Sequence, residues 1–239
     1  MDLAIVIPVA ILAGVAGLGI MAVRRSQARQ LALRQAVSDW AARNNFQCQH
    51  NLSDEMPLRI SGREDDLEFV LECRTPLQGD SHRPPEMVWT CRARAAESLE
   101  LIVLDRKVYD FSQSKLGQMV TSMAAGAAAG LPRAGAQQRW LERIQALKGF
   151  QPVPASLGAG RFVVLARQPE RWPELLSREV VALLEAWPPS KAPFELPTIT
   201  LDQNGVEVEV AGKLLEEQKL HHLIRLGAAV VRAVQASDG

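Results

Sequence analysis

The sequence predicts an α+β fold: one N-terminal transmembrane helix, followed by a mainly antiparallel sheet packed with amphipathic helices. Three observations support this prediction. Residues 3–23 contain no charged side chain, several later segments alternate apolar and polar residues, and the last third contains segments with apolar residues at helical spacing. The chain has 239 residues, 47% hydrophobic and 23% charged, which is enough apolar material for a folded core.

The first expected element is a membrane span over residues 3–23, with the sequence LAIVIPVAILAGVAGLGIMAV. At 1.5 Å per residue it reaches about 31 Å, close to the thickness of a hydrocarbon core. No helical face of this segment is polar, which argues against a buried helix of a soluble protein. A cleaved signal peptide is the alternative, but the basic n-region of such a peptide is missing. We therefore predict a transmembrane anchor over residues 1–25.

Positive charge lies on one side of this segment. Only Asp2 precedes it, whereas four arginines follow it: Arg24, Arg25, Arg29 and Arg34. The positive-inside rule then predicts a single-pass protein of the inner (cytoplasmic) membrane, with its soluble domain in the cytoplasm. The same arginines are expected to contact anionic lipid headgroups, at about 1 kcal/mol each, or else only to fix the topology.

Small residues four apart within the span, such as Ala10 and Gly14, allow two helices to approach closely. They suggest a homodimer, and a different membrane protein is the other expected kind of partner.

The soluble part begins with a helix and continues with strands. Residues 26–45 are expected to form a juxtamembrane helix, and residues 46–111 a strand-rich α+β section. Within that section, residues 66–74 and 87–94 alternate apolar and polar side chains, and residues 99–104 form a further apolar run. An antiparallel meander is the natural interpretation.

The second half contains a connector and a more regular section. Residues 112–149 are rich in Ala and Gly and are expected to form a flexible, partly helical connector. Residues 150–239 are predicted to be an α+β section. Its expected elements are a strand over 161–166, a helix over 170–187, a hairpin over 194–210 and a helix over 213–235. The pattern leaves open whether the two strand-rich sections share one sheet or form two lobes.

Charge and cysteine content exclude some classes of function. Lysine plus arginine and aspartate plus glutamate each number 27. No overall basic field exists to attract nucleic acid, so duplex binding is not expected as the main function. The three cysteines are odd in number, which argues against a secreted disulfide framework and fits a reducing compartment.

The best candidate for a metal site is Cys48-Gln49-His50, because residues two apart on a strand point to the same face. Cys73 and Cys91 would have to complete the tetrahedron, yet they lie far apart along the chain. We therefore expect buried structural thiols, and we predict no metal, no cofactor and no catalytic residue.

Other polar motifs have structural explanations. His221 and His222 are adjacent on a helix and point about 100° apart, so they do not share an ion. The Gly158-Ala159-Gly160 segment precedes a strand and lacks the strand-to-helix context of a phosphate-binding loop. No nucleophile elbow, Walker loop or kinase signature is present.

One family resemblance rests on the order of elements. A single N-terminal span is followed by a strand-rich section, then RFVVLARQPERWPELLSREVVALLEAW, a hairpin LDQNGVEVEV and a terminal amphipathic helix. This arrangement resembles a loosely defined group of bacterial membrane-anchored proteins of unknown function, over most of the chain from Leu58 onward. The resemblance implies bacterial origin and a membrane-tethered α+β domain, and it supplies no activity.

Two functional hypotheses follow. The favoured one is a non-enzymatic, single-pass membrane protein that acts as a tethered interaction or assembly module. It is favoured because the sequence shows no convergent set of reactive residues, and tethering raises the effective concentration toward membrane partners. The alternative is an enzyme or ligand-binding domain whose site is built from scattered residues. Its candidate site would contain Cys48, His50, Cys73 and Cys91.

Overall fold

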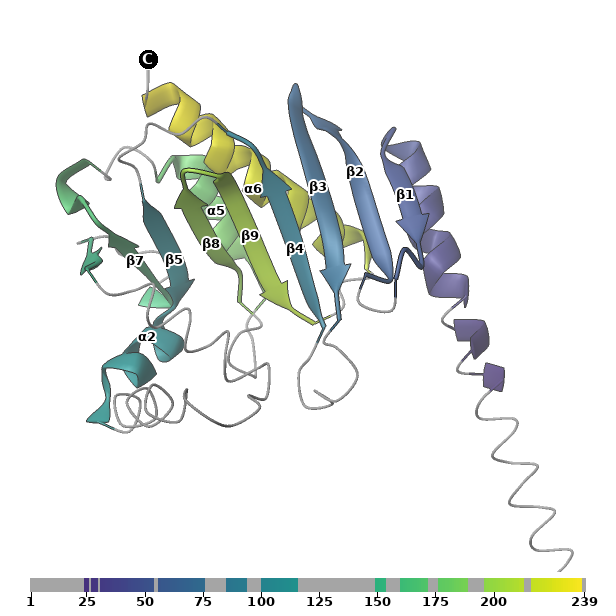
Figure 1. Ribbon diagram of the computed structural model, residues 1–239, viewed down its shortest axis with the longest axis horizontal. Coiled ribbons are helices and arrows are strands. Elements are labelled where there is room, and N and C mark those ends of the chain that lie inside the picture. Colours follow the sequence, from purple (N-terminus) through teal and green to yellow (C-terminus); the bar gives the residue numbers. More distant parts are fainter. Residues whose placement is uncertain are drawn as a thin grey trace, which may run out of the picture.

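The computed structural model describes the part of the chain from residue 24 to residue 237, with gaps. The described ranges are 24–25, 27–29, 31–53, 56–75, 85–93, 100–115, 149–153, 160–171, 176–188, 196–212 and 216–237. They form a nine-stranded antiparallel sheet with helices packed on it (Figure 1). The strand order is β1-β2-β3-β4-β9-β8-β5-β7-β6.

In chain order, the strands are β1 (Gln47–His50), β2 (Leu58–Glu64), β3 (Leu67–Arg74), β4 (Glu86–Cys91), β5 (Leu101–Asp105), β6 (Gln151–Pro152), β7 (Phe162–Ala166), β8 (Thr198–Asp202) and β9 (Gly205–Ala211). The helices are α2 (Arg106–Gln113), the short 3-10 helix η2 (Pro169–Arg171), α5 (Arg178–Ala186) and α6 (Glu217–Ser237). An N-terminal helix over residues 31–43, with 24–25 and 27–29 also helical, packs beside β1 and is called the basic helix below.

The fold class expected from sequence is wrong in its membrane-spanning part. None of the described helices is long and apolar enough to cross a membrane. The segment 3–23, on which that prediction rested, lies outside the described residues. The apolar stripe of α6 packs against the sheet, while Arg225 and Arg232 stay partly exposed on its outer side. The corrected fold class is a nine-stranded antiparallel sheet with packed helices.

The alternating pattern of the strands places one face of the sheet in the core. In β3, Phe69, Leu71 and Cys73 are buried, whereas Val70 and Glu72 between them face the other side. β4 pairs with β9 over Glu86–Cys91, so the two strand-rich sections of the sequence share one continuous sheet.

Other expected elements differ in extent. Of the expected connector over residues 112–149, residues 116–148 lie outside the described part of the chain. The helix expected over 170–187 consists of η2 and α5, with residues 172–175 not described.

Helix α6 lies across the back of the sheet in the view of Figure 1 and contacts β2, β4 and β9. Its contact with β4 is close at Gly227: a Cβ atom built there would lie 2.4 Å from ring atoms of Trp89. Trp89 is fully buried and stacks at 6.2 Å against Phe69. Because Gly227 has no side chain, the indole can lie flat against the helix backbone.

Polar groups cap both ends of α5. At its start, the Ser177 side chain accepts a hydrogen bond from the backbone N–H of Val180. At its end, the guanidinium of Arg161 donates to the backbone carbonyls of Leu184 and Trp187. A cation at this end also complements the helix dipole.

A second, smaller core lies on the opposite face of the sheet at β5 and β7. All five residues of β7 are buried, because Val163 and Leu165 face α2 while their neighbours face the main core. Val108 and Tyr109 of α2 pack on this patch together with Leu104. The sheet is therefore covered on both faces at this end.

Replacing Gly227 by alanine is predicted to lower the free energy of unfolding by about 1–3 kcal/mol, because the new methyl group would collide with the Trp89 ring. Alanine would otherwise favour a helix by about 1 kcal/mol, so the sign of the effect is diagnostic. Urea denaturation measures it. The matched test repeats Gly227→Ala in a Trp89→Leu background, where the cost should largely vanish. An equal cost in both backgrounds would contradict the assignment.

Candidate functional site

Cys48 and His50 lie on the edge strand β1, on the side of the sheet that faces the core. Their register partners are Ile60 and Leu58, both buried residues of β2. The basic helix runs beside β1, so that Ser38 reaches the two side chains. The sequence prediction that Cys48 and His50 share a face therefore agrees with this arrangement.

Three polar atoms converge at this point. The Cys48 Sγ lies 3.5 Å from His50 Nε2, and the Ser38 Oγ lies 2.9 Å from the same nitrogen. Ser38 also donates a hydrogen bond to Cys48 Sγ at 3.9 Å. The imidazole makes a further hydrogen bond to the backbone of Arg34. Sequence reasoning missed Ser38, because no local pattern shows which helix residue will face a strand.

The local environment keeps the pair uncharged. Burial raises the pKa of the Cys48 thiol, and the hydrogen bond from Ser38 only partly opposes this effect. Burial, followed by the positive charge of Arg34, lowers the pKa of the His50 imidazole. At neutral pH the site holds a thiol and a neutral imidazole. This is not the thiolate–imidazolium pair of a preactivated cysteine nucleophile.

The other two cysteines do not join this pair. Cys73 is paired with Leu58 and Met87 in the sheet, so it lies two strands away from His50, about 10 Å. Cys91 is buried on β4, and burial followed by the negative charge of Glu68 raises the pKa of its thiol. Within the described ranges, no group of three or more His, Cys, Asp or Glu side chains is arranged to hold a metal ion. The four-residue cluster proposed from sequence is therefore not assembled.

The arginines expected to meet lipid lie on the basic helix. Arg24, Arg25 and Arg29 are exposed, and Arg34 is half-buried near His50. Leu31 and Leu33 are 65% and 43% exposed, and they are two of the four large apolar side chains that are exposed among the described residues. In Figure 1 the start of this helix projects beyond the ends of the strands. Exposed cationic and apolar side chains thus share one projecting segment.

The face of the sheet opposite α6 is polar and open between β1 and β8. A solvent-open concavity of about 1260 Å³ extends over it. Its charges largely neutralise one another: Glu72 lies 3.0 Å from the Arg74 guanidinium and 3.9 Å from that of Arg59. Arg63 and Glu68 form a further pair at 3.7 Å. This face lacks the enclosed, mainly apolar walls of a small-molecule pocket.

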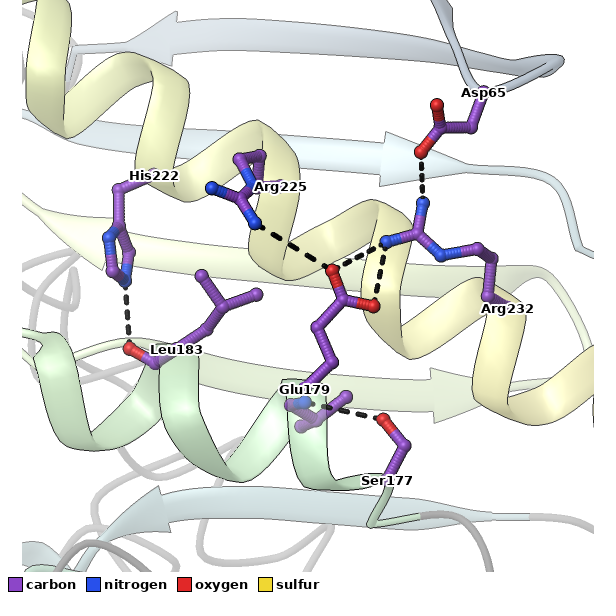
Figure 2. A network of polar contacts seen from close by, with 8 residues as sticks. Asp65, Ser177, Glu179, Leu183, His222, Arg225 and Arg232 are labelled. Atoms are coloured by element: carbon purple, nitrogen blue, oxygen red, sulfur yellow. Dashed lines mark hydrogen bonds and ion pairs between the residues drawn. The ribbon is translucent and has the colours of Figure 1, made fainter.

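A separate polar network joins α5, α6 and the β2–β3 turn (Figure 2). Arg232 of α6 donates to both carboxylate oxygens of Glu179 at 2.9 and 3.0 Å and to Asp65 in the turn. His222 hydrogen bonds to the Leu183 carbonyl at 2.7 Å. Each group here is satisfied by a neighbouring element. The network therefore has a structural role, holding helices and turn together.

Glu179→Gln is predicted to lower the free energy of unfolding by about 1 kcal/mol or less, because the pair with Arg232 is partly exposed. The loss should shrink at high salt, where such charges are screened. Denaturation at low and high ionic strength measures both effects. Glu185→Gln, an exposed position on the same helix, serves as the control. Equal effects of the two substitutions at low salt would contradict this role.

Alkylation of the native protein is predicted to modify Cys48 first, because Cys73 and Cys91 are only 2% and 7% exposed. A raised pKa leaves less thiolate at any given pH. Cys48 should therefore react more slowly at pH 7.5 than a peptide cysteine, whose pKa is about 8.5. As the pH is raised further, the alkylation rate of Cys48 should still increase at pH values where the rate of the peptide cysteine is already constant. Peptide mass spectrometry reads out each site, with urea-denatured protein as the control. Equal native labelling of all three thiols would disprove the assignment.

Comparisons with known proteins show no family. No model of a protein family matches the chain, and no curated protein matches it. Among solved structures, the chain is similar to the crystal structure of the mycobacterial trehalose monomycolate transport factor A, TtfA. The identity is 9% and the TM-score 0.46, with 86% of this chain and 93% of that chain covered. A likeness at this level supports no conclusion about function.

Proposed function

We propose that this protein is an interaction module that docks on anionic membrane surfaces through its basic helix, which positions the sheet domain next to the bilayer. The observation that supports it is the composition of the exposed part of that helix. Residues 24–38 contain four arginines and no acidic residue, and the next acidic residue along the chain is Asp39. The cationic segment also exposes Leu31 and Leu33.

Leu31 and Leu33 each have an arginine beside them on the helix surface. Arg24 and Leu31 are seven residues apart, two helical turns, so they lie on nearly the same face. Arg29 and Leu33 are four apart and are also neighbours on the helix surface. Residues two apart on a helix point about 200° apart, so Leu31 and Leu33 lie on nearly opposite sides and one leucine–arginine pair at a time can lie at headgroup depth. In such a pair the leucine enters the interface and the long arginine side chain beside it reaches the phosphates.

The position of the helix allows this contact without disturbing the fold. Val37, Trp40 and Ala41 anchor the second half of the helix in the core. The first half projects beyond the sheet, where Arg24, Arg25 and Arg29 are exposed. The helix anchored in the core is thus preceded by exposed cationic residues that are also helical. The anionic cytoplasmic leaflet is the surface of complementary charge.

Each arginine near an anionic surface contributes about 1 kcal/mol, so three of them account for about 3 kcal/mol. This corresponds to an affinity difference on the order of a hundred-fold at low salt. Because the Debye length is about 10 Å at 0.1 M salt, added salt should weaken this contribution.

The triple substitution Arg24→Gln, Arg25→Gln and Arg29→Gln is predicted to remove most of the preference of the full-length protein for anionic vesicles. The measurement is flotation with vesicles of phosphatidylcholine alone and with phosphatidylglycerol added, at low and high salt. The ratio of the two affinities is the readout, so any charge-independent attachment cancels. The preference of the unsubstituted protein should fall on the order of a hundred-fold.

A matched control replaces three arginines elsewhere on the surface, Arg63, Arg92 and Arg178, by glutamine. The two triple variants lose the same net charge at different places on the surface. The control should keep the anionic preference of the unsubstituted protein. Equal losses in both variants would mean that net charge governs binding. An unsubstituted protein with no anionic preference would overturn the proposal outright.

A further inference from the structure

The chemistry of the site between β1 and the basic helix is independent of lipid binding. Cys48 Sγ and His50 Nε2 lie 3.5 Å apart and point into the same small space. For an ion with bonds of about 2.3 Å to sulfur and 2.0–2.1 Å to nitrogen, the edge of a tetrahedron between these atoms is about 3.5 Å. The two side chains thus already have the separation that one tetrahedral ion requires.

The orientation of the imidazole also suits a metal ligand. Its Nε2 faces Cys48 and Ser38, while the ring makes a further hydrogen bond to the backbone of Arg34. Histidines that bind metals commonly use one ring nitrogen for the ion and donate the other to a carbonyl or carboxylate, which fixes the ring. Here such an outer contact comes from the basic helix, and Nε2 remains directed at the thiol.

The donor atoms define which ions fit. Sulfur and imidazole nitrogen favour thiophilic ions such as Zn²⁺, whereas Mg²⁺ and Ca²⁺ prefer oxygen ligands. Cys48 and His50 are both half-exposed, so water can occupy the remaining coordination positions. The Ser38 hydroxyl lies within hydrogen-bond distance of both Cys48 Sγ and His50 Nε2. It can stay hydrogen bonded to the sulfur when the thiol loses its proton.

We propose that Cys48 and His50 bind one Zn²⁺-type thiophilic ion per chain, with water completing its tetrahedral shell. On binding, the S–H bond of Cys48 breaks and its proton passes to solvent, water ligands leave the hydrated ion, and bonds from the metal to Cys48 Sγ and His50 Nε2 form in their place. No electron is transferred. With two protein ligands the ion exchanges readily, unlike the ion of a closed four-ligand structural site.

The test titrates the full-length protein with Cd²⁺ under reducing conditions free of chelators, following the ultraviolet charge-transfer absorption of the Cd–thiolate bond. Zn²⁺ is then added as a competitor, and the bound metal is counted by equilibrium dialysis. The expected result is one ion per chain and a Cd–thiolate absorption band that Zn²⁺ suppresses. The molecular mass of the protein in solution should not change when the metal binds. Mg²⁺ should not compete.

Substitutions assign the ligands. Cys48→Ser should abolish the thiolate band, and His50→Gln should weaken binding by at least about ten-fold. Cys73→Ala, which removes a buried thiol outside the site, should leave binding unchanged. Circular dichroism verifies that each variant is folded, and Cys48→Ala replaces Cys48→Ser if that variant is not.

Three results would overturn the proposal. They are the absence of a thiolate band in the unsubstituted protein, a band that persists without Cys48, and one ion per two chains with a doubled mass. None of them bears on vesicle binding, which the basic helix would mediate through different side chains.

Discussion

The close approach of helix α6 to the sheet is the constraint on which the rest of the structure depends. At Gly227 the helix backbone lies against the ring of Trp89, at a distance that admits no side chain. From this contact the apolar stripe of α6 extends over β2, β4 and β9, and it contributes a large share of the main core. Burial of this many aliphatic side chains, at about 25 cal/mol per Å² of apolar surface, is the main favourable term in folding. The same helix carries Arg232 to the ion pairs with Glu179 and Asp65.

Individual strands could be predicted from the sequence, because the alternation of apolar and polar residues reflects burial of one face of the sheet. The alternation in 66–74 corresponds to β3, and the Asp202–Gly205 turn joins β8 to β9 as expected. The strand order was not readable. β9 lies between β4 and β8, and the residues that pair it with β4 are more than a hundred positions away in sequence. No periodicity within a strand encodes such a partner.

The candidate site was also predicted only in part, because local geometry shows in the sequence and tertiary contacts do not. Cys48 and His50 are two residues apart on one strand, so their common face follows from the geometry of an extended chain. Ser38 and Arg34 reach them from a helix, and that contact depends on tertiary packing. Cys73 and Cys91 were candidates by residue type alone, and the sheet register separates them from the pair.

The position of β9 has a consequence for the order in which a growing chain can fold. Strands β1 to β4 are consecutive hairpin neighbours and can pair as soon as they are made, but β4 then has one unpaired edge. That edge stays bare through the synthesis of everything up to Gly205, and α6, which covers the apolar face behind it, comes later still. A nascent chain therefore carries a half-sheet that is open to wrong strand partners until its final segment arrives. Truncation before Gly205 would remove both β9 and α6, and would leave that half-sheet with an unpaired edge and an uncovered apolar face.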